Sequence, residues 1–375
     1  MNLLSDLLGC SVEAIDTPSL VIDLDAMERN LDCMAAFAAL HRVKLRPHAK
    51  MHKSATLAKL QMARGAVGVC VQKTSEAEAL AALGVNNIYI SNEVVSPLKL
   101  KRVVTLAKEL MALGGQLAIA VDSAEGLQRL ATAARGQHTV IQVFIEIDVG
   151  HGRCGVAPGA AAIPLAAEVL RHSGLQFGGL QAYHGRAQHL RRAAERREGI
   201  SRVIAHVEAT KASLQAAGFD VPLVTGAGTG TFSLEAASGV YGELQTGSYL
   251  FMDRDYAGNE TDPSHPAFEH ALFVKSQVMS VSSGHAVVDA GHKSHAIDSG
   301  LPSVHGLDLE YANGGDEHGI VRGAVLPALG DTVWLIPGHC DPTVNLHDHL
   351  LGVRGGLAHG TVEQIIKVDA RGALT

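Results

Sequence analysis

The first two thirds of the chain alternate between short apolar runs and longer segments with helical periodicity. The longest helical segment covers residues 197–218, where Ile200, Val203 and Val207 recur at the spacing of an amphipathic helix. The strand-like runs are 19–23, 43–48, 68–72, 87–91, 116–122, 140–148, 177–183 and 222–226. Several of these runs are apolar at consecutive positions, which is typical of a parallel sheet buried on both faces.

Strand–helix units repeat from about residue 18 to about residue 240. About eight such units predict an α/β fold, a (β/α)₈ TIM barrel. A doubly wound open sheet with helices on both faces is the alternative.

After about residue 250 the pattern changes, because helical periodicity nearly disappears. The strand-like runs there are 271–281, 285–291, 331–339, 350–356 and 363–372, joined by turns that contain Gly and Pro. This pattern predicts a C-terminal all-β domain. We therefore divide the chain into a segment 1–17 that packs on the β domain, a barrel 18–250 and a β domain 251–375.

The composition narrows the class of protein. Of 375 residues, 47% are hydrophobic and 18% are charged, which excludes an intrinsically disordered chain. A net charge of −7 without long basic runs argues against nucleic acid or an anionic membrane as a partner. No apolar run reaches the length of about 18 residues that a membrane helix needs, and residues 1–10 are a poor signal peptide. The five cysteines are scattered without a CxxC pair, so we expect a soluble cytoplasmic protein.

Lys50 is the first candidate for chemistry. It lies in LRPHAKMHK, two residues after a predicted barrel strand and close to Arg46 and His48. Residues that follow barrel strands line the active-site mouth. Burial and cationic neighbours would lower the pKa of the Lys50 amine and allow it to form a Schiff base. A solvated loop lysine is the simpler interpretation of this residue taken alone.

A glycine-rich turn follows the last predicted barrel strand. The segment TGAGTG, residues 225–230, offers backbone N–H groups and threonine hydroxyls to an anion. Phosphate sites are common at this place in barrels. The spacing is not GxGxxG, so a purely structural turn is equally compatible with it.

A histidine and an aspartate form a candidate metal pair in GHCDPTVNLHD. His339 and Asp341 are two positions apart, so in an extended chain both side chains point to one side. An imidazole and a carboxylate suit Mn²⁺, Mg²⁺ or Zn²⁺ with open water positions. A chain with 20 histidines also produces such pairs by chance.

Four further residues are weaker candidates. Arg153 in GHGRCG could bind a cofactor oxygen, and Tyr183 in QAYHGRAQH could pack on a planar cofactor. His189 ends the same segment, and Asp316 in GGDEHG could reach a site between the domains. A surface arginine, a core tyrosine and a solvated turn are the alternative interpretations.

Taken in order, these motifs resemble a known family. TPSLVIDLD, LRPHAKMHK, VCVQKTSEAEAL, YISNEVV, EIDVGHGRCGV, LQAYHG, TGAGTGTF, GVYGELQTGSYLFMD, DEHG and PGHCDPTVNLHD form one ordered series over nearly the whole chain. The series resembles pyridoxal-phosphate enzymes of the alanine-racemase-like fold, specifically the D-threonine aldolase and D-serine dehydratase group. The resemblance implies a barrel followed by a β domain, and a homodimer.

The resemblance also implies roles for individual residues. Lys50 matches the lysine that forms a Schiff base with pyridoxal 5'-phosphate, Arg153 the arginine near the phenolic oxygen of the cofactor, and Tyr183 the tyrosine at the cofactor. The phosphate-binding turns match Gly228, Thr229, Gly247, Ser248 and Tyr249.

The substrate side of the site is implied less directly. His339 and Asp341 match the metal pair, and His189 and Asp316 are candidate catalytic groups on the substrate side. The dehydratases of this group typically have His-x-Cys, in which a thiolate favours Zn²⁺, whereas this chain has His339-Cys340-Asp341. A carboxylate suits Mn²⁺ or Mg²⁺ and matches the aldolases.

We therefore expect a lyase that splits D-β-hydroxy-α-amino acids into glycine and an aldehyde. A β-hydroxyaspartate aldolase that gives glyoxylate is one alternative, and a D-serine or 3-hydroxyaspartate dehydratase is another. An amino-acid racemase would need a second base and no metal. A vitamin-carrier protein that only binds the cofactor would resemble the barrel alone.

Overall fold

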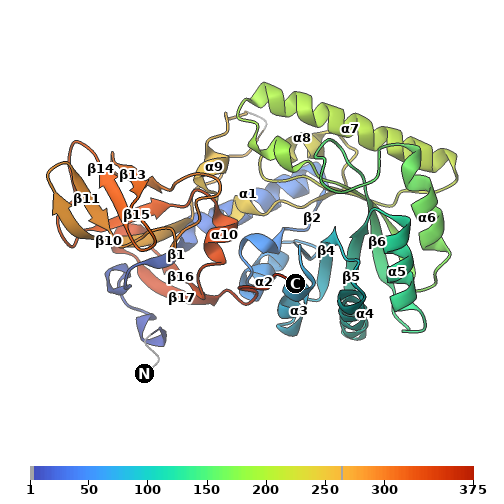
Figure 1. Cartoon of the computed structure of the whole chain (residues 1–375), viewed down its shortest axis with the longest axis horizontal. Helices are drawn as coiled ribbons and strands as arrows, with labels where there is room; N and C mark the ends of the chain where they lie inside the picture. Colours follow the sequence, from blue (N-terminus) through green and yellow to red (C-terminus); the bar gives the residue numbers. More distant parts are fainter. Residues whose placement is uncertain (1–3, 263–264) are drawn as a thin grey trace.

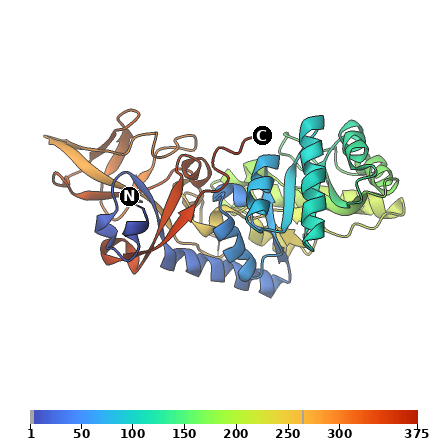
Figure 2. The same ribbon diagram turned by 90° about the horizontal axis from the view of Figure 1, so that it is seen from below.

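The computed structural model describes residues 4–262 and 265–375. It contains a parallel barrel and a second, largely antiparallel sheet, which lie side by side along the longest axis of the molecule (Figures 1 and 2). In the described part of the chain, no helix is both long and apolar enough to cross a membrane.

Eight parallel strands form the barrel in the order β2-β9-β8-β7-β6-β5-β4-β3. They are β2 (Lys44–Leu45), β3 (Val69–Val71), β4 (Asn87–Glu93), β5 (Gln116–Val121), β6 (Ile141–Glu146), β7 (Leu175–Ala182), β8 (Val224–Gly226) and β9 (Glu243–Leu244). The ends of the sheet meet through backbone hydrogen bonds from Val67 N to Leu45 O and from Cys70 N to Pro47 O, both 2.8 Å long. The predicted barrel is therefore confirmed over the open sheet.

Helices cover the outside of the barrel, as expected when each strand is buried on both faces. They are α1 (Leu24–His41), α2 (Ala55–Ala63), α3 (Thr74–Ala82), α4 (Pro97–Ala112), α5 (Ala124–Ala134), α6 (Ile163–Leu170), α7 (Ala193–Ala216) and α8 (Phe232–Ala237). Helix α5 begins where the Ser123 side chain accepts a hydrogen bond of 3.2 Å from Gly126 N, an N-cap of the usual kind.

The second sheet has nine strands and confirms the predicted β domain. Seven of them run in the order β13-β14-β11-β10-β1-β16-β17, while β15 pairs with β10 and β12. The strands are β1 (Ser19–Asp23), β10 (Leu272–Ser282), β11 (His285–Val288), β12 (Ser303–Val304), β13 (Glu310–Asn313), β14 (Gly319–Arg322), β15 (Thr332–Ile336), β16 (His349–Arg354) and β17 (Thr361–Lys367). Short helices α9 (Arg254–Ala257), α10 (Cys340–Val344) and α11 (Gly356–His359) complete the chain.

Strand β1 differs from the prediction, which placed the run 19–23 in the barrel. It pairs with β10 on one side, with Val21 opposite Phe273, and with β16 on the other, with Val21 opposite Leu351. A short apolar run fits either buried sheet equally well, so periodicity does not tell which sheet it joins. The eighth barrel strand is instead β9, which has only two residues, one of them Glu243.

The described part of the N-terminal segment lies against the β domain. Gly9 N donates to Val362 O over 2.9 Å, and Val12 N donates to Gly360 O over 2.8 Å. The buried Lys275 amine donates to the carbonyl oxygens of Val12 and Ile15 at 3.0 and 2.6 Å. Residues 1–3 of this predicted segment lie outside the described residues.

One apolar cluster joins the two domains. It contains Met27 of α1 and Met51 from the barrel, together with Leu250, Leu272 and Leu335, each at most 1% exposed. Because the cluster includes residues next to Lys50 and residues of the β-domain sheet, it holds the barrel mouth against the β domain. Figure 2 shows α1, in blue, extending from the β domain to the barrel.

Candidate active site

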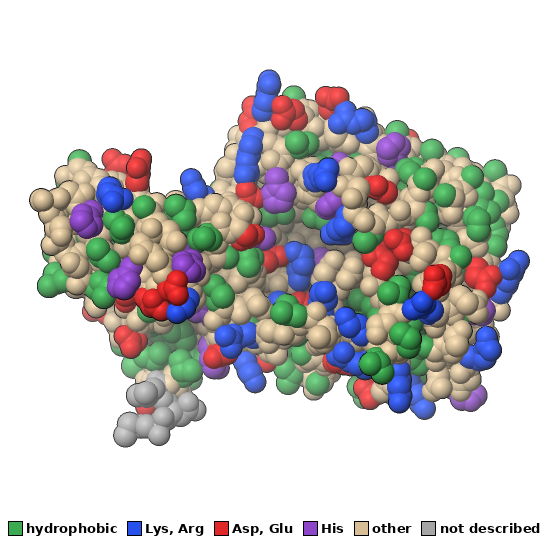
Figure 3. All heavy atoms as spheres, viewed as in Figure 1, with side chains coloured by type: hydrophobic (Ala, Val, Ile, Leu, Met, Phe, Trp, Pro, Cys, Tyr) green, Lys and Arg blue, Asp and Glu red, His purple; other side chains and the backbone are tan. Residues whose placement is uncertain are grey.

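A cavity of about 310 Å³ lies where the carboxyl ends of the barrel strands face the β domain. Most of the predicted site residues line it: Lys50, Arg153, Tyr183, His189, Gly228, Thr229, Gly247, Ser248 and Asp341. Its hollow is visible near the centre of Figure 3, with basic and histidine side chains on its rim. The barrel mouth is the usual place for an active site in this fold.

Lys50 lies in the single turn η3 (Ala49–Met51) that follows β2, and its amine forms an ion pair with Asp341. Burial would lower the pKa of Lys50, but the negative charge of Asp341 and the nearby Tyr183 raise it above the usual value. The prediction of a lowered pKa is therefore wrong for this structure. It failed because Asp341, 291 positions away in sequence, reverses the effect of burial.

The two cationic neighbours expected for Lys50 do not act as cations on it. Arg46 points into the barrel, where its Nε lies 3.1 Å from the buried Glu243 carboxylate. His48 is half-buried, and its Nε2 lies 3.0 Å from Gln72 Oε1. Burial and the charge of Lys50 lower the pKa of His48 to about 3, so this imidazole is neutral at pH 7.

Two turns after β8 and β9 form a cradle on one side of the cavity. A Cβ on Gly228 would lie 2.6 Å from Gln188 Oε1, and a Cβ on Gly247 would lie 3.1 Å from His48 O. The hydroxyl of Thr229 accepts a hydrogen bond of 3.0 Å from Tyr249 N and so ties the turns together. Neither position has room for a side chain without a shift of its neighbours, and glycine turns of this kind can present backbone N–H groups to an anion.

Tyr249 contributes its backbone to this cradle and not its side chain. The ring is 2% exposed, and the hydroxyl accepts a hydrogen bond of 3.2 Å from Gln61 Nε2. Burial raises the pKa of this phenol above its ordinary value. The residue lies behind the cavity and anchors the turn that begins at Ser248.

Arg153 and Tyr183 lie together on the barrel side. The Arg153 guanidinium carbon is 5.9 Å from the centre of the Tyr183 ring. Arg153 Nη2 lies 3.7 Å from Glu146 Oε1. Burial, with the charge of Glu93 added, raises the pKa of Glu146 to about 9, so this carboxyl is largely protonated at neutral pH.

Sequence reasoning missed Glu146 and Glu93, although both had a signal. Glu146 lies near the end of the predicted run 140–148, and Glu93 follows the predicted run 87–91; in the structure they end β6 and β4. An acidic residue at the carboxyl end of a barrel strand faces the active-site mouth.

The predicted metal pair lies on the β-domain side of the cavity. His339 caps α10 and Asp341 is in its first turn, so the segment is the start of a helix and not the extended chain assumed from the spacing. His339 Nε2 and Asp341 Oδ1 are nevertheless only 3.7 Å apart. Asp341 Oδ1 is buried and has no hydrogen-bond partner among the described residues.

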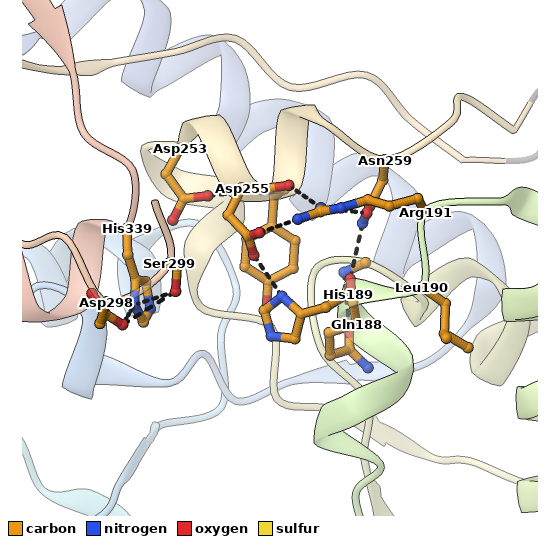
Figure 4. A network of polar contacts seen from close by, with 12 residues as sticks. Gln188, His189, Leu190, Arg191, Asp253, Asp255, Asn259, Asp298, Ser299 and His339 are labelled. Atoms are coloured by element: carbon orange, nitrogen blue, oxygen red, sulfur yellow. Dashed lines mark hydrogen bonds and ion pairs between the residues drawn. The ribbon is translucent and has the colours of Figure 1, made fainter. Parts of the chain in front are cut away.

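Polar contacts at Nδ1 orient the His339 ring. Its Nδ1 lies 2.7 Å from Asp298 Oδ2 and 3.4 Å from Ser299 Oγ (Figure 4). A carboxylate on one nitrogen directs the lone pair of the opposite nitrogen outward, as in many metal-binding histidines. Nε2 is thereby free to bind a metal ion beside Asp341.

His189 ends the turn η5 (Gly185–His189) and is oriented in the same way on the opposite side. Its Nδ1 lies 2.5 Å from Asp255 Oδ2, and Arg191 forms an ion pair with the other oxygen of that carboxylate (Figure 4). Asp255 and Asp298 were not predicted, because they lie 66 and 41 positions from their histidines. Only folding brings these pairs together.

Asp316 is not brought to the cavity within this chain. It lies in the turn between β13 and β14, and its side chain is 52% exposed. Its carboxylate pairs with His292 at 3.0 Å and with Lys293 at 3.2 Å. The sequence could not place this turn, because the distance of a hairpin from the barrel depends on the order of strands in the β sheet.

Comparison with known proteins agrees with the two-domain architecture described above. The family model described as alanine racemase, N-terminal domain, matches residues 22–255, and the putative serine dehydratase domain matches residues 271–353. The chain is 45% identical to a D-threonine aldolase from Arthrobacter sp, over 97% of this chain and 95% of that protein. It is 42% identical to a 3-hydroxy-D-aspartate aldolase from Paracoccus denitrificans (strain Pd 1222), over 97% and 94% of the two chains.

The fold agrees with that of a solved relative. The crystal structure of D-threonine aldolase from Filomicrobium marinum superposes with a TM-score of 0.94 at 45% identity, covering 98% of this chain and 99% of that one. The predicted resemblance is therefore confirmed along nearly the whole length. The chain belongs to the alanine racemase-like family, in the branch that joins a racemase-type barrel to a serine dehydratase-type β domain.

Proposed function

We propose that this chain is an aldehyde-lyase that cleaves the Cα–Cβ bond of D-β-hydroxy-α-amino acids of the D-threonine type, giving glycine and an aldehyde. The reaction would use pyridoxal 5'-phosphate and a divalent metal ion. The observation that carries the proposal is the contact of Lys50, on the barrel, with Asp341 of the metal pair on the β domain. One cavity thus holds an amine for the cofactor and ligands for a metal.

The residues present fit the cofactor. The close glycine turns at 228 and 247 leave space for a phosphate, Arg153 supplies a cation, and Tyr183 supplies a flat buried ring. Lys50 would hold the cofactor covalently. When bound, the cofactor ring supplies the electron sink for the charge that develops at Cα.

The residues also fit a hard divalent ion. Asp341 Oδ1 is buried and unpartnered among the described residues, and it faces the free Nε2 of His339. An imidazole–carboxylate pair favours Mn²⁺ or Mg²⁺, with Zn²⁺ as a third choice. When bound, the metal supplies Lewis acidity toward the β-hydroxyl of the substrate.

The chain's own side chains then have distinct tasks. His189 would accept the proton of the β-hydroxyl, since its Nε2 is turned away from Asp255. Arg153 and Tyr183 would hold the plane of the cofactor. Lys50 would have to leave Asp341 to hold the cofactor, and the Asp341 carboxylate would then be available as a metal ligand.

The basic side chains that line the cavity also favour a second substrate. Arg186 and His151 line the cavity, and in the described part of the chain Arg186 has no ion-pair partner. An unpaired cation there suits a substrate with a second carboxylate. 3-Hydroxy-D-aspartate, which would give glycine and glyoxylate, is therefore the second candidate substrate.

Three further proposals rest on the sequence. The protein would act as a homodimer, in which a second copy completes the site, and it would be cytoplasmic. Asp316 stays a prediction as a catalytic group, because in the single chain it lies in a turn of the β domain. A dehydratase is disfavoured because position 341 carries Asp and not Cys.

Product analysis tests this function. The purified protein, loaded with pyridoxal phosphate and Mn²⁺, is given D-threonine or D-3-hydroxyaspartate, with and without EDTA. Glycine plus acetaldehyde or glyoxylate, lost with EDTA and restored by Mn²⁺, is the expected result. Ammonia plus a keto acid would identify a dehydratase instead, and activity unchanged by EDTA would exclude the metal.

A further inference from the structure

The contact between His189 and Asp255 carries an inference that goes beyond the proposed function while resting on it. We propose that Asp255 is a positioning residue, which holds His189 as a general base with Nε2 directed at the substrate. Arg191 keeps Asp255 in place for this task. Asp255 itself touches neither the cofactor turns nor the metal pair in the contacts of the described residues.

The geometry determines which nitrogen of His189 can act. Asp255 Oδ2 lies 2.5 Å from Nδ1, and the imidazole also contacts the Tyr256 ring at a centroid distance of 5.6 Å. A carboxylate only accepts hydrogen bonds, so Nδ1 carries the hydrogen and Nε2 keeps its lone pair. Figure 4 shows Nε2 on the side of the ring away from Asp255. His189 lines the cavity, so this lone pair is available to a substrate.

Asp255 is held as a carboxylate. Its side chain is 7% exposed, and Arg191 contacts both its Oδ1 and its backbone carbonyl. Burial would raise the pKa of Asp255, but the hydrogen bonds from His189 and Arg191 lower it to about 2. The acceptor for Nδ1 is therefore present throughout the pH range in which enzymes of this kind are assayed.

The same turn is fastened to the metal-binding segment. Asp255 N donates to Gly338 O over 3.2 Å, and Arg254 N donates to Pro337 O over 3.0 Å. One residue earlier, the Asp253 carboxylate accepts from Cys340 N over 3.1 Å. Residues 253–255 therefore connect the base to the turn that carries His339 and Asp341. A base and a metal that act on one hydroxyl need a constant separation, and this connection supplies it.

Several other charged or titratable groups face His189 from the elements around it. They are Arg186 of η5, Arg191, Tyr256 of α9 and, across the cavity, Lys50, Tyr183 and Asp341. Among the described residues, Asp255 alone makes a polar contact with the imidazole. Its removal should therefore change the orientation and the tautomer of His189 directly.

The test compares Asp255→Asn with Asp255→Glu and with Asp348→Asn, a matched control in an exposed ion pair with Arg371. We expect Asp255→Asn to lower kcat by about 10²-fold with KM changed by less than about threefold, since general bases contribute factors of this size. Asp255→Glu should restore part of kcat, and Asp348→Asn should behave as wild type.

A double-mutant cycle separates positioning from a general structural effect. In a His189→Asn background, Asp255→Asn should cause no further loss of kcat, because its role acts through the imidazole. Imidazole nitrogen NMR of the Mg²⁺-loaded holoenzyme provides a readout besides activity. The His189 signal, identified by its loss in His189→Asn, should show hydrogen on Nδ1 in wild type and a shifted tautomer balance in Asp255→Asn.

These measurements distinguish a failure of the positioning role of Asp255 from a failure of the proposed aldolase function. Additive losses in the cycle, or an unchanged tautomer in Asp255→Asn, would overturn the positioning role. If Asp255→Asn unfolds, judged by its melting temperature, the same measurements on Asp255→Glu decide the question. Ammonia released by the wild-type enzyme would refute the proposed aldolase instead, while the tautomer measurement would still test Asp255.

Discussion

The two walls of the cavity differ in origin and in charge. The barrel wall carries Lys50 and Arg153 on segments that follow parallel strands, whereas the β-domain wall carries Asp341, on the turn after β15 that also holds His339. In the proposed function, the barrel would therefore attach the cofactor and the added domain would bind the metal. Each function should therefore be removable without the other.

The pKa values of the histidines at the two walls shift in opposite directions. On the barrel wall, burial and the charge of Lys50 lower the pKa of His48 to about 3. On the β-domain wall, burial opposes protonation of His339, but Asp341 and Asp298 more than offset it and raise its pKa. At His48 burial and charge act in the same direction, whereas at His339 the neighbouring carboxylates reverse the effect of burial.

The largest expected effect is on the barrel wall. Lys50→Ala should abolish covalent attachment of pyridoxal phosphate and lower activity by about 10³-fold or more, because the activated amine is lost. Mass spectrometry after borohydride reduction measures the attachment, and elemental analysis should find the metal still bound. Simultaneous loss of the metal would contradict the proposal that cofactor attachment and metal binding are independent.

The corresponding substitution on the β-domain wall is Asp341→Asn, which tests metal binding. Asp341→Asn should remove most of the bound metal and lower activity by about 10²-fold, since one of two protein ligands is lost. Borohydride should still attach the cofactor to Lys50. An Asp341→Asn protein with a full complement of metal would show that Asp341 is not a ligand.

A smaller effect is expected at the glycine cradle. Gly228→Ala should weaken cofactor binding by about tenfold, because its Cβ would lie 2.6 Å from Gln188 Oε1 and displace the turn. Gly199→Ala in α7 is the matched control, since its Cβ would meet only Leu190 Cδ1, at 3.5 Å. Fluorescence titration with pyridoxal phosphate measures the affinity of each variant for the cofactor. Equal affinities would show that the glycine cradle does not bind it.

The smallest effect is on stability in acid. Burial lowers the pKa of His52, beside Lys50, from 6.5 to about 4. Between these values the unfolded chain binds a proton that the folded chain does not, so the free energy of unfolding falls as pH decreases, by about 1.4 kcal/mol per pH unit. The drop in melting temperature from pH 7 to pH 5 should be smaller in His52→Gln than in wild type.

The exposed histidine of α7 provides the control for this measurement. His206→Gln should leave the drop in melting temperature unchanged. If both variants melt as wild type at each pH, the acid sensitivity of the barrel wall does not come from His52.

Much of this arrangement could be predicted from the sequence, for a physical reason. Strand and helix periods are local, so the barrel and most of its strands follow from them, and the ordered motifs carry Lys50, Arg153 and the metal pair. Features set by distant partners could not be predicted. The raised pKa of Lys50 depends on Asp341, and the orientation of His189 depends on Asp255.

The position of β1 has a consequence for how the protein is made. This strand, near the start of the chain, lies in the middle of the β-domain sheet between β10 and β16. A ribosome therefore synthesises the entire barrel before residue 272 supplies the first neighbour of β1, and its second neighbour follows only from residue 349. The sheet that contains β1 is therefore completed only after the barrel, and the turn that carries His339 and Asp341 is made in the same late stage.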